Sequence, residues 1–380
     1  PRNVHQSAIS GLILAGAMPV FVQPEYDPIL DLAHCVTPEA IALALAHHPD
    51  AKAVLIVSPT YFGACGDVAA IAQICHQHGI PLLVDEAHGA HFAFHPDLPT
   101  PALQAGADLV VQSTHKVLSA LTQAAMLHLQ GNLMDRALLT KSLALVQSTS
   151  PNYLLLASLD AARYQMAHQG KEWMAHTLEL AKEARSRLSN LAPLTLLSAD
   201  QASTPGFVAL DVTRLTVTIA KLGIDGFTVD DWLNTQQGVT AELPTLQHLT
   251  FIITLGNTQQ DIDRLVQSFE WLVKTANHHS PTALKPQNLN LETSPCIALS
   301  PRDAFFAPVE AVAIAQAVDR ISAELVCPYP PGIPVLMPGE LVTEAAIAHL
   351  QQLIAAGGTI SGCTDTTLQT LRVLKSQKTN

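Results

Sequence analysis

The sequence predicts an α/β fold built on a mostly parallel sheet. Three short apolar runs in the first third of the chain are separated by helical patterns, and each run ends at polar residues. Strands of this kind, alternating with helices, are typical of a parallel sheet that is covered on both faces. Ligands of such sheets bind beyond the carboxyl ends of the strands, so the polar residues there are the first candidates for a functional site.

Composition argues against several other classes of protein. The 380 residues are 48% hydrophobic and 14% charged, with a formal net charge of −12 and no Lys/Arg-rich run, so we expect no nucleic-acid partner. No apolar stretch reaches the roughly 18 residues of a membrane helix, and no secretory signal is present, so we expect no membrane association. Six cysteines without a CxxC pair indicate reduced thiols and a cytoplasmic location, and seventeen histidines without HExxH spacing indicate no metal.

The first residues have the pattern of the middle of a domain. We expect a short helix around Ala8–Ala15 and then a strand at Pro19–Val22, with no earlier strand beside it. This pattern predicts that a segment upstream of Pro1 is missing from the sequence.

The elements of the large domain follow from local patterns. Asp67 is placed to cap a helix that ends at Gly79 and whose apolar residues share one face, namely Val68, Ile71, Ala72 and Cys75. We expect buried strands within Lys52–Thr60, Ile80–His88 and Asp108–Lys116. Their ends bring polar residues to one edge of the sheet: Ser58, Thr60, Tyr61, Asp85, His88, Ser113, His115 and Lys116.

Later segments predict two further parts. Long helices are expected at about Asn152–His168 and Glu172–Asn190, and Pro193 marks a change to a smaller α/β unit. In that unit, a helix opening at Thr258 has Ile262, Leu265, Val266 and Phe269 at helical spacing. A Pro- and Asn-rich linker is expected at 275–295. Prolines in Cys327–Glu340 exclude a regular helix there. The predicted domains are 1–190, 195–275 and 290–380.

Lys116 raises a chemical hypothesis. A lysine screened from water has a lowered pKa and becomes an amine nucleophile that can form a Schiff base with an aldehyde. A carboxylate such as Asp85, on a neighbouring strand end, would keep a pyridine nitrogen protonated, as pyridoxal phosphate requires. Ser113 could donate to a phosphate, and His5 or His88 could lie flat on the ring.

Each of these residues also has an ordinary interpretation. Lys116 could be solvated, Asp85 could cap the following turn, and His88 and His91 could be surface histidines. The letters DEAH also occur in helicase motifs, but no GxxxxGK[ST] loop precedes them here. Composition and spacing alone leave the cofactor a hypothesis.

The stretch VQSTHKVLSALTQAA (Val111–Ala125) resembles the pyridoxal-phosphate attachment signature of the Orn/Lys/Arg decarboxylase family, and every position of the signature matches. The resemblance covers essentially the whole chain. It implies a large domain of pyridoxal-phosphate fold type I, a smaller α/β domain and the C-terminal domain of the family. Further blocks that resemble the family are Arg2–Ser7, Ser58–Gly63, Val84–His91, Gln147–Arg163, Ser300–Ala307 and Tyr329–Glu340.

The resemblance also implies roles for individual residues. Lys116 would bind the cofactor covalently, Asp85 would pair with its ring nitrogen, His5 would stack on the ring, and His88 would lie near its edge. Ser113 and His115 would flank the phosphate, and Ser148 and Thr149 of the Ser148–Pro151 segment would approach the cofactor of a partner subunit. Glu340 would bind the distal cation of the substrate, with Glu242 and Asp303 as alternatives.

Ordinary interpretations remain open for several of these residues too. Ser148 and Thr149 could cap the next helix, Glu340 could fix the proline-rich loop, and Arg163 and Arg302 could be structural. The family also uses a Ser/Thr-rich turn, upstream of the Arg2–Ser7 block, to bind the phosphate.

The implied activity is the pyridoxal-phosphate-dependent decarboxylation of lysine, arginine or ornithine to the corresponding amine and CO₂, by a homodimer or higher homo-oligomer. The proton donor at the α-carbon would be His88 or Lys116. The alternatives are an aminotransferase or acyl-CoA condensing enzyme of the same fold, and an inactive truncated paralogue. The C-terminal block at Tyr329–Glu340 argues for the decarboxylase.

Overall fold

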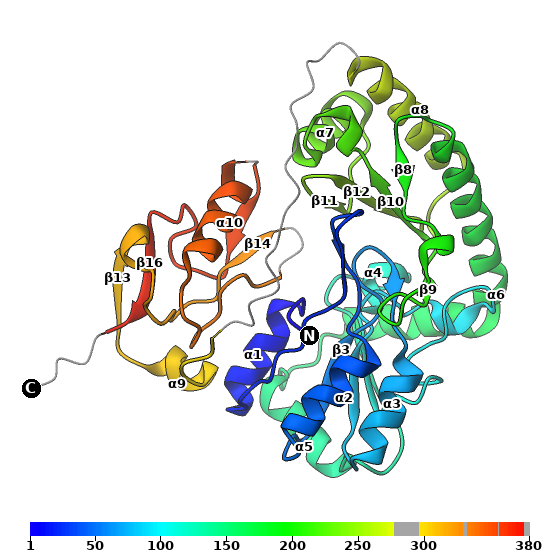
Figure 1. The fold of residues 1–380 in the computed structure, drawn as a ribbon. Coiled ribbons are helices and arrows are strands. Elements are labelled where there is room, and N and C mark those ends of the chain that lie inside the picture. Colours follow the sequence, from blue (N-terminus) through cyan, green and yellow to red (C-terminus); the bar gives the residue numbers. More distant parts are fainter. Residues whose placement is uncertain (277–295, 330–332, 356, 376–380) are drawn as a thin grey trace, which may run out of the picture.

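The computed structural model describes residues 1–276, 296–329, 333–355 and 357–375. The chain forms two adjoining parts, which the long helix α6 connects, and a third part beside them that contains the C-terminal residues (Figure 1). The linker expected at 275–295 lies, apart from its first two residues, outside the described residues.

A four-stranded sheet is the centre of the first part. Its order is β3-β5-β6-β7, and β3, β5 and β6 run parallel while β7 is antiparallel, so the predicted mostly parallel sheet is confirmed. The strands are Val54–Val57 (β3), Leu82–Asp85 (β5), Leu109–Gln112 (β6) and Met126–Leu129 (β7).

Helices α2 (Pro38–His47) and α3 (Val68–Gln77) cover one face of this sheet. The Asp67 side chain accepts a hydrogen bond from the amide of Ala70, so the predicted cap of α3 is confirmed. The predicted apolar face is also confirmed, because its members all lie in the core beneath the sheet: Val68, Ile71, Ala72 and Cys75.

The opposite face of the sheet is only partly covered by the described residues. The strand register places Leu55, Val111 and Leu127 on that face, and their exposed fractions are 38%, 38% and 37%. The expectation that both faces are covered is therefore met only in part by the described residues, because α1 (Gln6–Ala15) covers this face at Val57 but not at these three residues.

Two local predictions are wrong. Pro19–Val22 is not a strand: this stretch runs beside the N-terminus, where the amide of Arg2 donates to the carbonyl of Val22. The two helices predicted around residue 170 are a single helix, α6 (Tyr153–Ser189). The helix continues through Gly170. A Cβ at this position would lie 3.1 Å from both Met166 and Phe94, so glycine allows the helix to pack closely against Phe94.

The second part contains the antiparallel sheet β11-β12-β10-β8. Its strands are Leu243–Pro244 (β11), His248–Ile252 (β12), Arg214–Thr218 (β10) and Thr195–Leu196 (β8), and its helices are α7 (Gly226–Trp232) and α8 (Gln259–Ala276). The four predicted apolar residues of α8 are buried in one core with the C-terminal half of α6. Helix α6 therefore joins the first part to the second.

The third part forms its own apolar core and lies beside α1 (Gln6–Ala15). Its helices are α9 (Pro301–Phe306) and α10 (Glu344–Ala355), and its strands are Val309–Ala313 (β13), Cys327–Tyr329 (β14), Thr359–Ser361 (β15) and Thr370–Leu374 (β16). The described residues of Cys327–Glu340 contain no helix, as the prolines predict.

Short elements complete the chain. Strands β1 (Tyr26–Asp27) and β2 (Leu32–Ala33) pair with each other, as do β4 (Ala64–Cys65) and β9 (Ala209–Leu210). The remaining helices are α4 (Thr114–Val117), α5 (Arg136–Val146), 3-10 turns at Phe92–Phe94, Ala199–Gln201, Ala220–Leu222 and Ile314–Gln316, and a π-helix at Leu233–Gln237.

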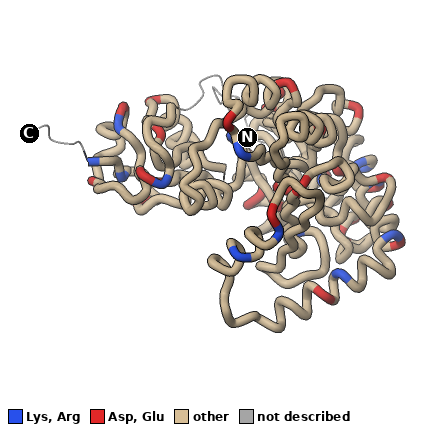
Figure 2. The backbone as a smooth tube through the Cα atoms, turned by 90° about the horizontal axis from the view of Figure 1, so that it is seen from below, with Lys and Arg blue, Asp and Glu red and all other residues tan. Residues whose placement is uncertain are grey.

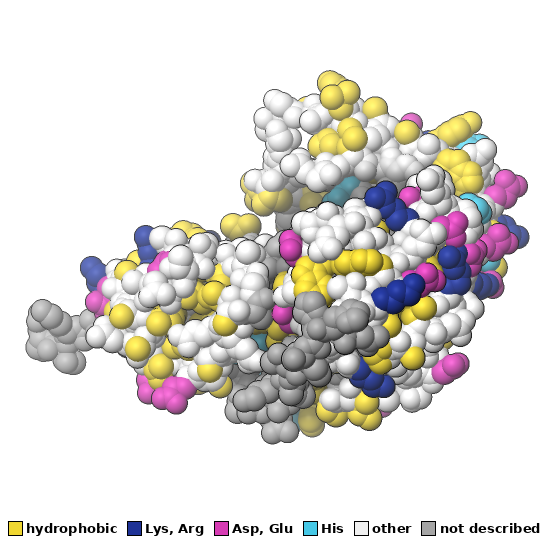
Figure 3. Space-filling model, turned by 90° about the horizontal axis from the view of Figure 1, so that it is seen from above, with side chains coloured by type: hydrophobic (Ala, Val, Ile, Leu, Met, Phe, Trp, Pro, Cys, Tyr) yellow, Lys and Arg dark blue, Asp and Glu magenta, His cyan; other side chains and the backbone are white. Residues whose placement is uncertain are grey.

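The surface agrees with the composition. Lysine and arginine alternate with acidic residues along the described backbone rather than gathering in one region (Figure 2). Apolar side chains are spread among uncharged ones over the face that Figure 3 shows. None of the described helices combines the length and apolar character that crossing a bilayer demands, and the six cysteines are free thiols.

Candidate active site

Lys116 lies just beyond the end of β6, in the short helix α4. Strand β6 ends at Gln112, four residues earlier than the predicted segment, and the chain then turns so that the Lys116 amide donates to the Ser113 carbonyl. The lysine Nζ lies 3.0 Å from Nε2 of His88 and 5.5 Å from the ring centre of Tyr61. Lys116 is thus directed at two rings rather than at bulk solvent.

The environment of Lys116 favours its uncharged amine. Burial lowers the pKa of Lys116, Asp85 and Glu242 oppose that shift, and Arg214 adds to it. The net direction is downward, which is what a lysine needs in order to act as a nucleophile near neutral pH.

Asp85 and His5 lie close enough to Lys116 to influence its electrostatics. Burial raises the pKa of Asp85, while Lys116, His5 and a hydrogen bond from the Ala87 amide act to lower it. Burial and Lys116 lower the pKa of His5, and Asp85 opposes them. The bond from Ala87 means that Asp85 does cap the turn after β5, as its ordinary interpretation holds, in addition to facing Lys116.

His88 is buried between the side chains of Lys116 and Arg214. Its Nε2 faces Lys116, and its Nδ1 lies 2.7 Å from Nη2 of Arg214. Burial, together with the charges of Arg214 and Lys116, holds the pKa of His88 well below its usual range. His88 is therefore a neutral ring and not a surface histidine.

The residues expected around the phosphate lie next to Lys116 in the chain. Ser113 precedes α4 without using its hydroxyl to cap that helix. His115 donates from Nδ1 to the carbonyl of Ala124 at 2.8 Å, and this bond ties α4 to the loop that follows it.

The Ser148–Pro151 segment is exposed and lies between α5 and α6. Asn152 caps α6 by accepting from the amides of Leu154 and Leu155, so the interpretation of Ser148 and Thr149 as the cap is wrong. Ser148 makes only local contacts with the backbone of Ser150.

Glu340 lies apart from this group, in the third part of the molecule. Its Oε2 accepts from Nη2 of Arg2 at 3.1 Å and from the amide of Met337 at 2.9 Å, and its side chain is 1% exposed. Arg2 also donates to the carbonyls of Pro334 and Val335. These contacts favour the second of the two open interpretations, that Glu340 fixes the proline-rich loop.

An open cavity of about 570 Å³ begins at Lys116. Lys116 is its one lining residue from the first part, the others belong to the second part, and its charged lining consists of Lys116, Glu242, Asp261 and Arg264. Glu242 lies in the cavity and also near enough to act on Lys116, whereas neither Glu340 nor Asp303 lines it.

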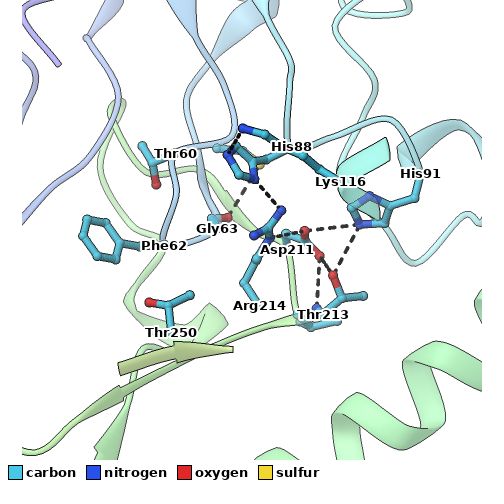
Figure 4. A network of polar contacts seen from close by, with 12 residues as sticks. Thr60, Phe62, Gly63, His88, His91, Lys116, Asp211, Thr213, Arg214 and Thr250 are labelled. Atoms are coloured by element: carbon cyan, nitrogen blue, oxygen red, sulfur yellow. Dashed lines mark hydrogen bonds and ion pairs between the residues drawn. The ribbon is translucent and has the colours of Figure 1, made fainter. Parts of the chain in front are cut away.

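Sequence patterns missed Asp211, Thr213 and Arg214, which form a buried polar network with His88 and His91 (Figure 4). The available signal was the pair of opposite charges in ALDVTRLTVT, an otherwise apolar segment. Asp211 and Arg214 are both fully buried there. No group of metal-ligating side chains is found among residues 1–276 and the described parts of 296–375.

Comparison with known families adds independent information. Residues 1–210 match the family model described as Orn/Lys/Arg decarboxylase, major domain, and residues 285–368 match the Orn/Lys/Arg decarboxylase C-terminal domain. The major-domain model therefore matches the N-terminal half of the chain, and the C-terminal-domain model matches the third part.

Individual relatives agree with the family models. The chain is 38% identical over 378 residues to arginine decarboxylases of Bacillus subtilis and Halalkalibacterium halodurans, covering 100% of this chain and 77% of each relative. A solved structure of lysine decarboxylase A from Pseudomonas aeruginosa has a TM-score of 0.81 at 23% identity. It covers 98% of this chain, which spans about two thirds (65%) of that longer protein. The likeness to this structure establishes the fold.

Proposed function

Because this chain belongs to the Orn/Lys/Arg decarboxylase family and is therefore a decarboxylase, we propose that its substrate is arginine, which it converts to agmatine and CO₂. The observation that supports arginine most directly is the name of the relatives at 37–38% identity, all of them arginine decarboxylases. The relatives named lysine decarboxylases are 22–25% identical.

We propose pyridoxal phosphate as the cofactor. When bound, it supplies an aldehyde for amines and a pyridinium ring that accepts the electrons of the breaking bond to the carboxylate. The residues present fit this group: Lys116 offers an amine with a lowered pKa, Asp85 a carboxylate for the ring nitrogen, and His5 a ring to stack on it. Ser113 and His115 would bind the phosphate side.

The chain's own groups then have distinct tasks. Lys116 would present an amine whose pKa burial lowers, Asp85 would offer its carboxyl group to the ring nitrogen, and His88 lies within hydrogen-bond distance of Lys116. His88 and Lys116 remain the two candidates for the proton donor to the α-carbon. The cavity that begins at Lys116 would receive the substrate side chain.

We propose Glu242 as the partner of the substrate's distal cation. Of the three carboxylates considered, Glu242 lines the cavity at Lys116, whereas Glu340 is engaged by Arg2. Glu242→Gln should raise KM for arginine with a smaller change in kcat, because it removes a charge from the binding cavity. Glu340→Gln should instead weaken the attachment of the proline-rich loop.

We also propose a homodimer. Helix α5 buries none of its residues, and Leu138, Leu145 and Val146 are largely exposed, as are Tyr153 and Leu154 at the start of α6. An apolar surface of this kind is typical of a subunit interface. In such a dimer, Ser148 and Thr149, which lie between these two helices, would approach the partner's site.

The experiment that tests the proposed function uses the purified product of the complete gene with pyridoxal phosphate. Arginine, lysine and ornithine are supplied in parallel, and CO₂ and the three amines are measured by mass spectrometry, with Lys116→Ala as the control. Agmatine that disappears in the variant supports the proposal. Cadaverine alone would make lysine the substrate and putrescine alone would make it ornithine, while the absence of any amine would refute the decarboxylation of a basic amino acid.

A further inference from the structure

A chain of buried polar contacts runs from Lys116 into the second part of the molecule (Figure 4). Lys116 meets His88, His88 meets Arg214 at the start of β10, and Nε of Arg214 lies 3.7 Å from Oδ2 of Asp211. Arg214 is separated from His88 by 126 positions and has 0% exposure. Helices and strands far apart in the sequence therefore converge behind the reactive lysine.

These contacts determine where the proton of His88 lies. A guanidinium has only donors, so Nδ1 of His88 must accept from Arg214 and holds no proton. A neutral imidazole with a bare Nδ1 has its proton on Nε2. That N–H points at Nζ of Lys116, and a hydrogen bond between them requires a lone pair on the lysine nitrogen.

From this geometry we propose that Arg214 is a positioning residue. It selects the tautomer of His88 that donates from Nε2, and through His88 it holds Lys116 as an uncharged amine. The inference rests on the proposed function, in which Lys116 must attack an aldehyde, and it assigns a task to a residue that does not itself line the cavity.

Asp211 keeps Arg214 in place. Its Oδ1 accepts from the hydroxyl and amide of Thr213, and Nε2 of His91 lies 3.2 Å from its Oδ2. Burial would raise the pKa of Asp211, but His91, Arg214 and Thr213 more than offset burial and lower it to about 2. The carboxylate is therefore ionised and balances the buried guanidinium.

A purely structural role explains Arg214 less well. Its Nε and Nη1 are buried without a hydrogen-bond partner among the described residues, which is unfavourable for a charged group. Gly63, at φ +94°, also makes room for it, because a Cβ there would lie 2.9 Å from Cβ of Arg214. Within the described residues, the terminal nitrogens of Arg214 make one hydrogen bond, and its partner is His88.

The charge of Arg214 lowers the pKa of both titrating groups, His88 and Lys116. Arg214, Lys116, His5 and His91 all disfavour a proton on a second nitrogen of His88. At Lys116, burial and Arg214 favour the neutral amine, while Asp85 and Glu242 favour the ammonium. Loss of Arg214 should therefore shift Lys116 toward its charged form.

The first test observes His88 directly in cofactor-free protein. Nitrogen-15 NMR of histidine-labelled protein distinguishes the two tautomers and the imidazolium, and the signal missing from His88→Gln assigns the residue. We expect the Nε2–H tautomer across the neutral pH range. A proton on Nδ1 of His88, or a cationic His88 ring, would overturn the proposal. This test requires no substitution of Arg214.

The second test measures Lys116 by reductive methylation with formaldehyde, followed by peptide mass spectrometry over a range of pH. In Arg214→Met, we expect methylation of Lys116 near neutral pH to fall roughly tenfold, equivalent to a pKa about one unit higher. Arg185→Met is the control, because Arg185 is partly buried and binds the backbone carbonyls of Val212, Leu197 and Arg214 but not His88. An unchanged pH profile in folded Arg214→Met would refute the positioning role.

A pair of His88 variants separates this role from packing. The amide of His88→Gln can still donate to Lys116 and should preserve most of the reactivity, whereas His88→Phe fills the space but cannot donate and should behave like Arg214→Met. Equal behaviour of the two variants would contradict the proposal. All these measurements use cofactor-free protein. They can therefore refute the positioning role of Arg214 while the amine assay supports arginine decarboxylation, or support that role while the amine assay refutes decarboxylation.

Discussion

Lys116 and Asp85 show how burial gives ordinary residues a chemical role. Burial moves the pKa of each toward its uncharged form, and the two side chains, being opposite in charge, limit each other's shift. A cationic ring placed beside Asp85 would further favour its carboxylate. Whether Asp85 is ionised therefore depends on the group that binds beside it. Removal of its carboxylate should affect catalysis more than stability.

We predict that Asp85→Asn lowers kcat by roughly 10²–10³-fold, the usual effect of losing a preorganised electrostatic partner. The asparagine can still accept from the Ala87 amide, so the turn after β5 should remain intact. The measurement is steady-state amine production, with cofactor retention followed by visible absorbance. Asp97→Asn, which removes an exposed carboxylate, is the control, and a loss of only a few-fold at Asp85 would count against its proposed role.

At the scale of elements, three neighbouring strands are joined by a row of polar side chains that are buried or partly buried. Glu86, just after β5, accepts from the Ala102 amide at 2.7 Å and from Nε2 of Gln112 in β6 at 2.6 Å. Gln112 in turn contacts His128 of β7 through its Oε1 at 2.9 Å. Burial raises the pKa of Glu86 to about 7, in spite of these two hydrogen bonds.

This pKa predicts a pH dependence of stability. The unfolded chain loses the proton of Glu86 near its ordinary pKa of 4.5, whereas the folded chain retains it to about 7. The unfolded state thus binds fewer protons between these values, and the free energy of unfolding should fall by up to about 3 kcal/mol as pH rises through this window. Glu86→Gln should flatten that fall, as measured by urea denaturation at a series of pH values.

The matched control is Glu179→Gln, which removes an exposed carboxylate from α6. It should leave the pH dependence as it is in the parent protein. If Glu86→Gln and Glu179→Gln have the same profile, the buried carboxylate of Glu86 contributes nothing to it.

Elements also show which features a sequence can predict. The cap at Asp67 and the apolar face of α3 depend on residues within a few positions of one another, and both were predictable. The close approach of α6 to Phe94 at Gly170 involves a residue 76 positions earlier in the chain, and the proposed role of Arg214 involves His88, which is 126 positions away. The signature around Lys116 and the VDEAHGAH block around Asp85 are local, whereas the local signal at Arg214, a pair of opposite charges in an apolar segment, gives no indication of its contact with His88.

At the scale of the whole molecule, some apolar surfaces of the described residues are not packed against any other described part of the chain. One face of the large sheet is open at Leu55, Val111 and Leu127, and α5 has no buried residue. Parallel sheets in stable proteins are covered on both faces, so surfaces of this extent are expected to be buried in an assembly. The proposed dimer would use α5 and the start of α6, which places the Ser148–Pro151 segment at the interface.

The proposed dimer predicts that each active site contains residues of both subunits. If Ser148 and Thr149 serve the partner's site, each site combines Lys116 of one subunit with these two residues of the other. A double variant, Ser148→Ala with Thr149→Val, should then be nearly inactive, and so should Lys116→Ala. Subunits of the two kinds, mixed under conditions that allow exchange, should regain activity.

The expected recovery follows from counting sites. With equal amounts and random pairing, half of the dimers contain one subunit of each kind, and each of these has one site with Lys116, Ser148 and Thr149 all intact. Activity should therefore return to about one quarter of the parent value. If Ser148 and Thr149 acted within their own subunit, each mixed dimer would have only damaged sites and mixing would restore nothing. Leu145→Asp, which charges the exposed face of α5, should prevent recovery and yield monomers in analytical ultracentrifugation, because the exchange of partners requires the interface itself.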